Sequence, residues 1–473
     1  MSYVVFLSSL AITKTFTTFV FMLDRFPSIF NNVIGPVMRG PSSSHTAASV
    51  RIGLLALKLL GEKPDSAIFR FDPKGSLATT YRGQGSAMGL AAGLLNMRIS
   101  DPDLINAEEI CVKKGIVLEF LIEDTGAVHP NTYACDISSK NNSVSFRAIS
   151  SGGGVISLIE LNGEKIEDDH KYIAELMPVK VHRSPELPFS NIDGLLKICK
   201  GKKLSDFALL WESSVGDMQG DEVLALAVSH LAIIKDSIET GLAGTEYADR
   251  ILKRQSHLID SLPAVGELIP DGVINSIIKS VSAIMESKSA MELIVAAPTA
   301  GSCGTIGGVL IPVAKLCGKT ENQLARALLA GGMVGVFIAQ QGGFAAEEGG
   351  CQYECGAASG MAAAALCELM GGDAEMAMNA ASMALQNTLG MICDPVANRV
   401  EVPCLGKNIM AALNALAACN MVIAGFDHVI PLKEVILAMQ DVGENMDSKF
   451  KCTCKGGLSV SETARRIESS LKK

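Results

Sequence analysis

Three cysteines in the C-terminal half of this 473-residue chain have the side chains best suited to metal chemistry: Cys351, Cys393 and Cys404. They stand among glycine, alanine and proline, and no fourth protein ligand follows at a matching spacing. A structural tetrahedral metal site needs four protein ligands, whereas an iron–sulfur cluster that acts as a Lewis acid leaves one iron open. The three cysteines therefore predict a catalytic cluster, although three buried core thiols would give the same spacing. Further possible ligands on chemical grounds are Cys355, Cys452 and Cys454.

Residues 40–46, Gly-Pro-Ser-Ser-Ser-His-Thr, precede an apolar helical stretch and form a candidate anion site. A serine can cap the helix there, and hydroxyls together with backbone N–H groups can bind a carboxylate. The alternative is an ordinary helix cap with His45 facing solvent. Residues 297–304, Ala-Pro-Thr-Ala-Gly-Ser-Cys-Gly, repeat the pattern. They could hold substrate, or they could form an interhelical turn that needs small residues for packing.

Two further groups of polar residues have ambiguous roles. His129 lies in a loop before a proline, where an imidazole is as often structural as catalytic. Glu347 and Glu348 come just before Cys351, so they could support the ligands of a cluster or form a solvated turn.

The composition excludes some classes of partner. The net charge is −9 and the one short basic run is Lys200, Lys202 and Lys203, so a nucleic-acid partner is not expected. Thirteen cysteines without a small stapled module favour a reducing compartment, and we expect a cytoplasmic protein without disulfides. Residues 1–23 read as an N-terminal extension, either a targeting peptide or a non-native segment. No apolar stretch there reaches the ~18 residues of a membrane-spanning helix.

The patterning predicts an α+β protein with an N-terminal α/β domain over residues 24–165. A glycine turn at 150–154 should feed an edge strand over 155–161. Other strands are expected over 67–71, 116–120 and 144–149, with helices over 47–60 and 83–95.

A linker over 166–190 should lead into an all-helical domain over 191–473, rich in alanine, leucine and methionine. This mostly all-α domain would be the catalytic one. Its expected helices cover 222–235, 272–285, 321–329, 360–370, 374–385 and 409–424. The glycine- and alanine-rich helices and the edge strand favour a homodimer.

Eight segments appear in order over nearly the whole chain from about residue 23: GPSSSHTAA, HPNT, SSGGG, APTAGSCG, GGCQ, GMAAAA, CDPVANRVEVPC and GGLSVSETARRIE. Together they resemble the iron–sulfur L-serine dehydratases (L-serine ammonia-lyases). The chain looks like the form whose β and α parts are separate subunits in some bacteria, fused here into one chain. The resemblance implies deamination of L-serine to pyruvate and ammonia. It also implies a 4Fe-4S cluster on Cys351, Cys393 and Cys404, with no pyridoxal phosphate.

The resemblance also implies roles for the two polar loops. It makes His45 the acid/base group, for which a near-neutral pKa is suitable. The residues that it assigns to substrate binding are Ser43, Ser44, Thr46, Thr299, Ala300, Gly301 and Ser302.

Several departures from the family's pattern bear on the substrate. Gln84 and Ala87 stand where many members carry a histidine and an aspartate, and residues 340–348 lack the usual asparagine-rich segment. A second hypothesis is therefore the same elimination on L-threonine or another small β-hydroxy acid, and a third is a non-catalytic iron–sulfur sensor. The chain ends in Lys472 and Lys473, not in the cysteine that occupies the free iron in some members. Cys452 or Cys454 could substitute for that cysteine.

Overall fold

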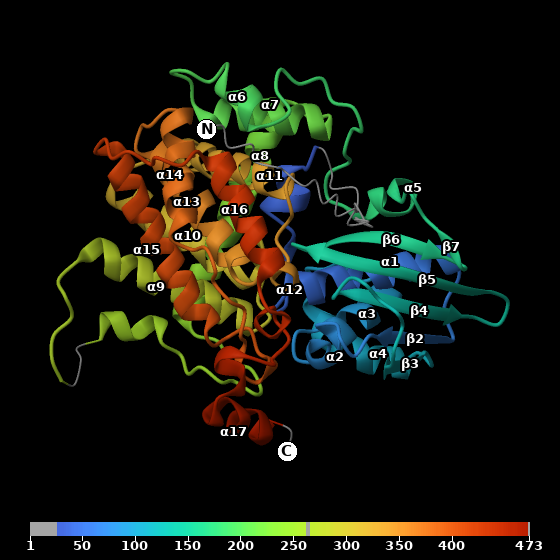
Figure 1. Ribbon diagram of the computed structural model, residues 1–473. Coiled ribbons are helices and arrows are strands. Elements are labelled where there is room, and N and C mark those ends of the chain that lie inside the picture. The colour runs from blue at the N-terminus through green and yellow to red at the C-terminus, as the bar shows by residue number, and fades with distance from the viewer. Residues whose placement is uncertain (1–25, 262–264, 472–473) are drawn as a thin grey trace, which may run out of the picture.

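The computed structural model describes residues 26–261 and 265–471, so the predicted N-terminal extension over 1–23 lies outside the described residues. A mixed β-sheet with short helices occupies the N-terminal part of the described chain, and helices make up most of the C-terminal part (Figure 1). The predicted α+β class is confirmed.

The main sheet has six strands in the order β3-β2-β4-β5-β6-β7. β2 and β3 are parallel, and the other neighbouring pairs are antiparallel. The three strands predicted over 67–71, 116–120 and 144–149 are present, but β6 is not at the edge because the two residues of β7 pair outside it. The bounds are β2 Ser66–Phe71, β3 Val117–Ile122, β4 Thr132–Ser138, β5 Ser143–Gly152, β6 Val155–Leu161 and β7 Glu164–Lys165.

Two helices, α1 (Ala48–Leu60) and α3 (Ser86–Leu94), pack tightly against each other beside this sheet. A Cβ atom on Gly53 would lie 2.4 Å from the carbonyl oxygen of Leu90, so only glycine permits this approach. Their apolar faces bury Phe69, Phe71 and Tyr133 of the sheet in one core. This core fixes the start of α1, where the polar loop 40–46 lies. The remaining short helices of this part are α2 Leu77–Thr80, α4 Ala107–Lys113 and α5 His170–Ile173.

The helical part contains every helix that the sequence predicts, each at or near the expected residues. Small residues allow its helices to approach closely: α13 is buried along its whole length and packs against α11 and α14. α11 is long and apolar enough to cross a membrane, but 83% of its apolar window is buried inside the protein, as in a core helix. The bounds are α6 Ile192–Leu196, α7 Leu204–Gly216, α8 Gly220–Ala243, α9 Gly272–Ser289, α10 Cys303–Leu316, α11 Glu321–Ala339, α12 Ala346–Gly349, α13 Ala357–Leu369, α14 Ala374–Gln386, α15 Cys404–Ile423, α16 Leu432–Asn445 and α17 Glu462–Leu471.

The segment before the polar loop ties the two parts together. Buried Glu212 of α7 accepts hydrogen bonds from the Ser28 hydroxyl (2.5 Å) and the Ile29 N–H (2.6 Å). Next along the chain, β1 (Val37–Met38) pairs antiparallel with β8 (Ile294–Val295) of the helical part. Loop 40–46 therefore lies directly beside loop 297–304, although some 250 residues separate them.

Candidate functional site

One cavity lies where the two parts of the protein meet. About 320 Å³ of space there, part of it open to solvent, is free of protein atoms. Hydroxyl, amide, carboxylate and thiol side chains meet there from both parts. The lining residues are Ser42, Ser44, Gln84, Gly301, Ala346, Glu347, Glu354, Cys393, Pro395, Val400, Cys404 and Cys452.

His45 is fully buried directly behind the cavity wall and does not face solvent. Its Nδ1 lies 3.2 Å from the Ser42 Oγ, 3.1 Å from the Ser44 Oγ and 3.4 Å from a carboxylate oxygen of Glu347. All three of these neighbours line the cavity, so Nδ1 is the ring nitrogen on the cavity side.

The other ring nitrogen, Nε2, is 2.7 Å from the Thr80 hydroxyl oxygen. Because that hydroxyl donates to the carbonyl of Ser76 (2.7 Å), its oxygen accepts the proton of Nε2. This assigns the neutral ring its lone pair on Nδ1, where the Ser42 hydroxyl is within hydrogen-bond distance. Burial lowers the pKa of His45, and the charge of Glu347 opposes that shift only in part. The imidazole is therefore held as a neutral base.

The serines of the polar loop have different partners. The Ser44 hydroxyl donates to Glu347 over 2.9 Å, and the Ser43 oxygen accepts the backbone N–H of Ala300 over 3.2 Å. This second bond joins the two polar loops. The Thr46 hydroxyl donates to the carbonyl of Gln84 over 2.9 Å, so it holds the loop and does not line the cavity.

Loop 297–304 forms the opposite wall through a buried carboxylate. The Thr299 hydroxyl donates to Glu354 over 2.7 Å, and a Cβ on Gly301 would lie 2.8 Å from the same carboxylate. The Ser302 hydroxyl donates to the carbonyl of Ala297 over 3.1 Å and thereby fixes the turn. Burial, followed by the charge of Glu347, raises the pKa of Glu354 to about 7.

Thiols form the third side of the cavity, which Cys393, Cys404 and Cys452 line; Cys351 contacts Cys393 but is not part of the wall. The sulfurs of Cys351 and Cys393 and a carboxylate oxygen of Glu354 all lie within 4.8 Å of one another. Cys404 reaches the same cavity from the first residue of α15. A fourth thiol, Cys452, contacts Cys393, because residues 450–452 run alongside Cys393 with backbone bonds of 2.8 and 3.1 Å.

A buried lysine and an asparagine support the thiol side. Lys407 Nζ donates to the carbonyl of Ile392 (2.6 Å) and to Asp394 (2.8 Å). Burial alone would lower the pKa of Lys407, but Cys351, Cys393 and Asp394 raise it above the ordinary value. Asn408 donates to the carbonyls of Gly301 and Cys404, at 2.8 and 2.9 Å, and so ties α15 to the substrate-side loop.

This donor set fits a metal cluster. Thiolates select soft metals and iron–sulfur clusters. Burial raises the pKa of Cys404 to about 12, so this thiol stays neutral until a bound cation displaces its proton. The positive charge of Lys407 opposes that shift and favours the thiolate of Cys404.

The other polar residues noted in the sequence have structural partners. His129 bonds Glu348 through Nε2, and neither residue lines the cavity. Gln84 donates to the Cys452 sulfur over 3.5 Å, whereas Ala87 is buried and does not line the cavity. Cys355 contacts Asn408 behind the wall, and the Cys454 sulfur bonds Asn398 at 2.6 Å.

The sequence indicated Cys452 and Glu347 only as candidates beside Cys355, Cys454 and Glu348, and the structure places these two in the cavity wall. The composition of the KCTCK segment did indicate a thiol pair. Only the fold shows that Cys452 meets Cys393 and Cys454 does not.

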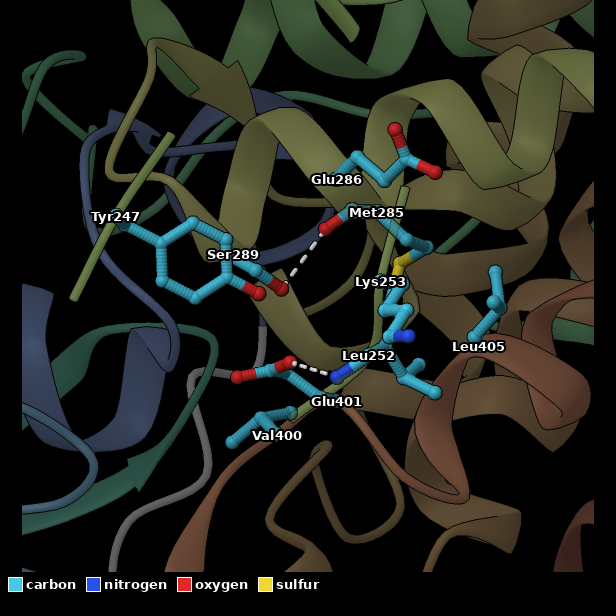
Figure 2. A pocket seen from close by; sticks show the side chains of 9 residues that line it. All are labelled: Tyr247, Leu252, Lys253, Met285, Glu286, Ser289, Val400, Glu401 and Leu405. Atoms are coloured by element: carbon cyan, nitrogen blue, oxygen red, sulfur yellow. Dashed lines mark hydrogen bonds between the residues drawn. The ribbon is translucent and has the colours of Figure 1, made fainter. Parts of the chain in front are cut away.

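A second pocket lies on the other side of Val400, which lines both (Figure 2). Its two carboxylates are occupied by backbone: Glu286 accepts from Gln255 and Ser256, and Glu401 accepts from Leu252. These bonds anchor Gln255 and Ser256 to α9, and Leu252 to the segment that precedes α15. The pocket therefore has a structural role that the first cavity does not share.

The family model and the curated relatives given below all carry the name serine dehydratase or L-serine dehydratase. The family model for the serine dehydratase alpha chain matches residues 164–459. A probable L-serine dehydratase alpha chain of Bacillus subtilis is 35% identical over 290 residues, which cover 60% of this chain and 95% of that protein. L-serine dehydratases of Streptomyces coelicolor and Escherichia coli (L-serine dehydratase 2) are 28% and 27% identical, each over 89% of this chain and 96% of theirs.

Proposed function

Because the chain belongs to the serine dehydratase alpha-chain family, we propose that it deaminates L-serine to pyruvate and ammonia. The observation that carries this proposal is the cavity in which Ser42, Ser44 and Glu347, backed by a neutral buried histidine, face a wall of thiols. Relatives that match nearly the whole chain are named L-serine dehydratases, which supports the same substrate.

We assign Cys351, Cys393 and Cys404 as the ligands of a 4Fe-4S cluster. When bound, such a cluster supplies a Lewis acid that polarises the carbon–oxygen bond of a substrate hydroxyl. Lys407 balances the negative charge of the thiolates, and Asn408 holds the start of α15 in place.

His45 is the residue that accepts the α-proton of serine. Its Nδ1 carries the lone pair on the cavity side, next to Ser42 and Ser44, and Thr80 fixes the ring from the other side. Loss of this proton and of the β-hydroxyl leaves an enamine, whose imine tautomer hydrolyses to pyruvate and ammonia.

Loops 40–46 and 297–304 hold the substrate between them. Ser44 and Gly301 line the cavity, and the bond between Ser43 and Ala300 keeps the loops at a fixed separation. Thr299 and Ser302 orient this wall, and Thr46 holds its own loop to Gln84.

A second candidate is the same elimination on L-threonine or another small β-hydroxy acid. The observation that favours it is Gln84 in the cavity wall. The family pattern described in the sequence analysis has histidine at this position in many members. An amide can donate a hydrogen bond there but cannot transfer protons.

The test is turnover by protein purified and reconstituted with iron and sulfide without oxygen. We expect pyruvate from L-serine at a rate well above 2-oxobutyrate from L-threonine. D-serine is the matched control, because it has the same groups with the opposite hand. A protein with full iron content that is faster on L-threonine would support the second candidate. One that is inactive on all three would contradict both.

We also propose that the protein is a cytoplasmic homodimer. The close-packed glycine- and alanine-rich helices and the absence of disulfides among the described cysteines support this proposal. Light scattering after gel filtration measures the mass directly.

A further inference from the structure

Glu347 carries a carboxylate oxygen that the protein leaves free. The residue is 4% exposed. Its Oε1 accepts the Ser44 hydroxyl at 2.9 Å and lies 3.4 Å from His45 Nδ1. Its Oε2 is buried and has no hydrogen-bond partner among the residues that the structure describes. A buried carboxylate oxygen without a partner is costly, so this atom is suited to receive a donor from a ligand.

The free oxygen belongs to the substrate cavity, because Glu347 is part of its wall. The other carboxylate of the wall is Glu354, whose two oxygens already contact the Thr299 hydroxyl and the Cys351 sulfur. Of the nearby buried cations, Lys407 is paired with Asp394 and Lys288 donates to the carbonyl of Val400. Among the described residues, His45 is the basic side chain within ion-pair distance of Glu347, and its imidazole is neutral. The cavity therefore offers a negative charge that lacks a lysine or arginine.

We propose that Glu347 binds the α-ammonium group of the substrate and thereby selects 2-amino acids over 2-hydroxy acids of the same shape. This inference rests on the proposed function, and it names the residue that recognises the amino group. An ammonium group is a cation with three donors, so it provides both the charge and the hydrogen bond that Oε2 lacks.

The position of Glu347 also fits the reaction. The ammonium nitrogen of an amino acid is bonded to the α-carbon, whose proton must reach the base. Since Oε1 of Glu347 lies 3.4 Å from His45 Nδ1, an ammonium group held by this carboxylate brings the α-carbon to the same side of the cavity as the base. The Ser44 hydroxyl fixes the carboxylate, so little ordering is needed when substrate binds.

Glu348 provides a matched control. It is the next residue along the chain, but its carboxylate bonds His129. It also does not line the cavity. Both residues can be changed to glutamine, which keeps the shape and removes the charge.

The experiment measures binding to the reconstituted holoenzyme by calorimetry with L-alanine and L-lactate. These ligands have the same carbon skeleton and differ in carrying an ammonium group or a hydroxyl group. Neither has the β-hydroxyl that is eliminated. We expect the wild-type protein to bind L-alanine about tenfold to a hundredfold more tightly than L-lactate. Glu347→Gln should reduce this preference to about twofold or less, and Glu348→Gln should keep it.

A preference that survives in Glu347→Gln, or that is absent from the wild type, would overturn the inference. A lower kcat for serine with the preference intact would also overturn it, because Glu347 would then act only by positioning His45. Thermal unfolding checks that the variant is folded, and Glu347→Ala serves as a second variant that must lose the same preference. The binding ratio needs no turnover. A wild type that binds L-alanine preferentially but makes no pyruvate would contradict the proposed function while leaving this inference intact.

Discussion

The sheet-bearing part and the helical part of the molecule bring different chemistry to one cavity. The first contributes serine hydroxyls and, behind them, the neutral imidazole of His45. The second contributes thiols, the buried lysine Lys407 and two carboxylates. Groups that handle protons thus lie mainly on one side, and groups suited to a metal lie on the other.

This division means that neither part has a complete site by itself. The β1–β8 pairing and the contacts of Glu212 hold the two sides in register. Variants on one side should therefore impair proton transfer and leave the metal in place, whereas variants on the other should release the metal. The predictions below test that separation.

The largest expected effect is that of His45→Ala. Because Nδ1 is the assigned proton acceptor, kcat for L-serine should fall by about a hundredfold to ten-thousandfold. Iron per chain should remain at the wild-type level, since His45 bonds hydroxyls and contacts no thiol. The control is His257→Ala, on the exposed surface. Loss of iron in His45→Ala would break the proposed separation.

Lys407→Met should give the complementary result. Removal of the buried positive charge should speed the loss of iron to a chelator by about tenfold, because groups that support metal ligands typically change affinity by that order. Lys433→Met, which removes an exposed lysine paired with Asp193, is the control. Unchanged iron retention would show that Lys407 does not support the cluster.

The pH dependence of the protein's stability tests the contact that Glu212 makes between the two parts. Burial raises its pKa from 4.5 to about 7, although hydrogen bonds from Ser28 and the backbone oppose the shift. Between these values the folded protein holds a proton that the unfolded chain does not. The contribution of protonated Glu212 to the free energy of unfolding is therefore complete below about pH 4.5 and is lost as the pH rises through 7. The effect amounts to roughly 3 kcal/mol at most.

Glu212→Gln should remove this dependence. The melting temperature of the wild type should fall more between about pH 6 and pH 8 than that of the variant, measured side by side. Parallel curves for the two proteins would contradict the assignment.

The smallest effect is expected for Cys452→Ser. Since the proposed cluster has three cysteine ligands and one iron without a cysteine, iron content and turnover should stay within about twofold of the wild type. Serine also preserves an acceptor for Gln84. Loss of iron comparable to that in a Cys393 variant would instead make Cys452 a fourth ligand.

Much of the fold could be predicted from residue patterns. The alanine- and methionine-rich runs at helical spacing gave the right helices, because small residues at close contacts leave few other arrangements. β4 escaped prediction because Thr132–Ser138 is buried at nearly every position and so lacks the alternation of a half-exposed strand. Some predicted helices were also too short. The helix predicted over 321–329 continues in α11 through glycines to Ala339.

Parts of the site could be predicted only where the residue types of one short segment indicate a chemical role. The two polar loops and the three cysteines could be singled out from their residue types. Glu347 could not be separated from Glu348, because the two adjacent residues have the same side chain and differ only in the burial and partners that the fold gives them. Cys452 lies 59 residues from Cys393, and their contact depends on how the chain returns after α16. Such pairings are set by tertiary packing, which local patterns do not encode.

The most direct test of the account is pyruvate release from L-serine by anaerobically reconstituted protein, measured together with iron per chain, for the wild type and for Cys393→Ala. Cys419→Ala, which removes a buried thiol outside the cavity, is the control. We predict that the wild type and the control bind iron and release pyruvate, and that Cys393→Ala does neither. Pyruvate release by Cys393→Ala, or an iron-loaded wild type that releases none, would contradict the central claim.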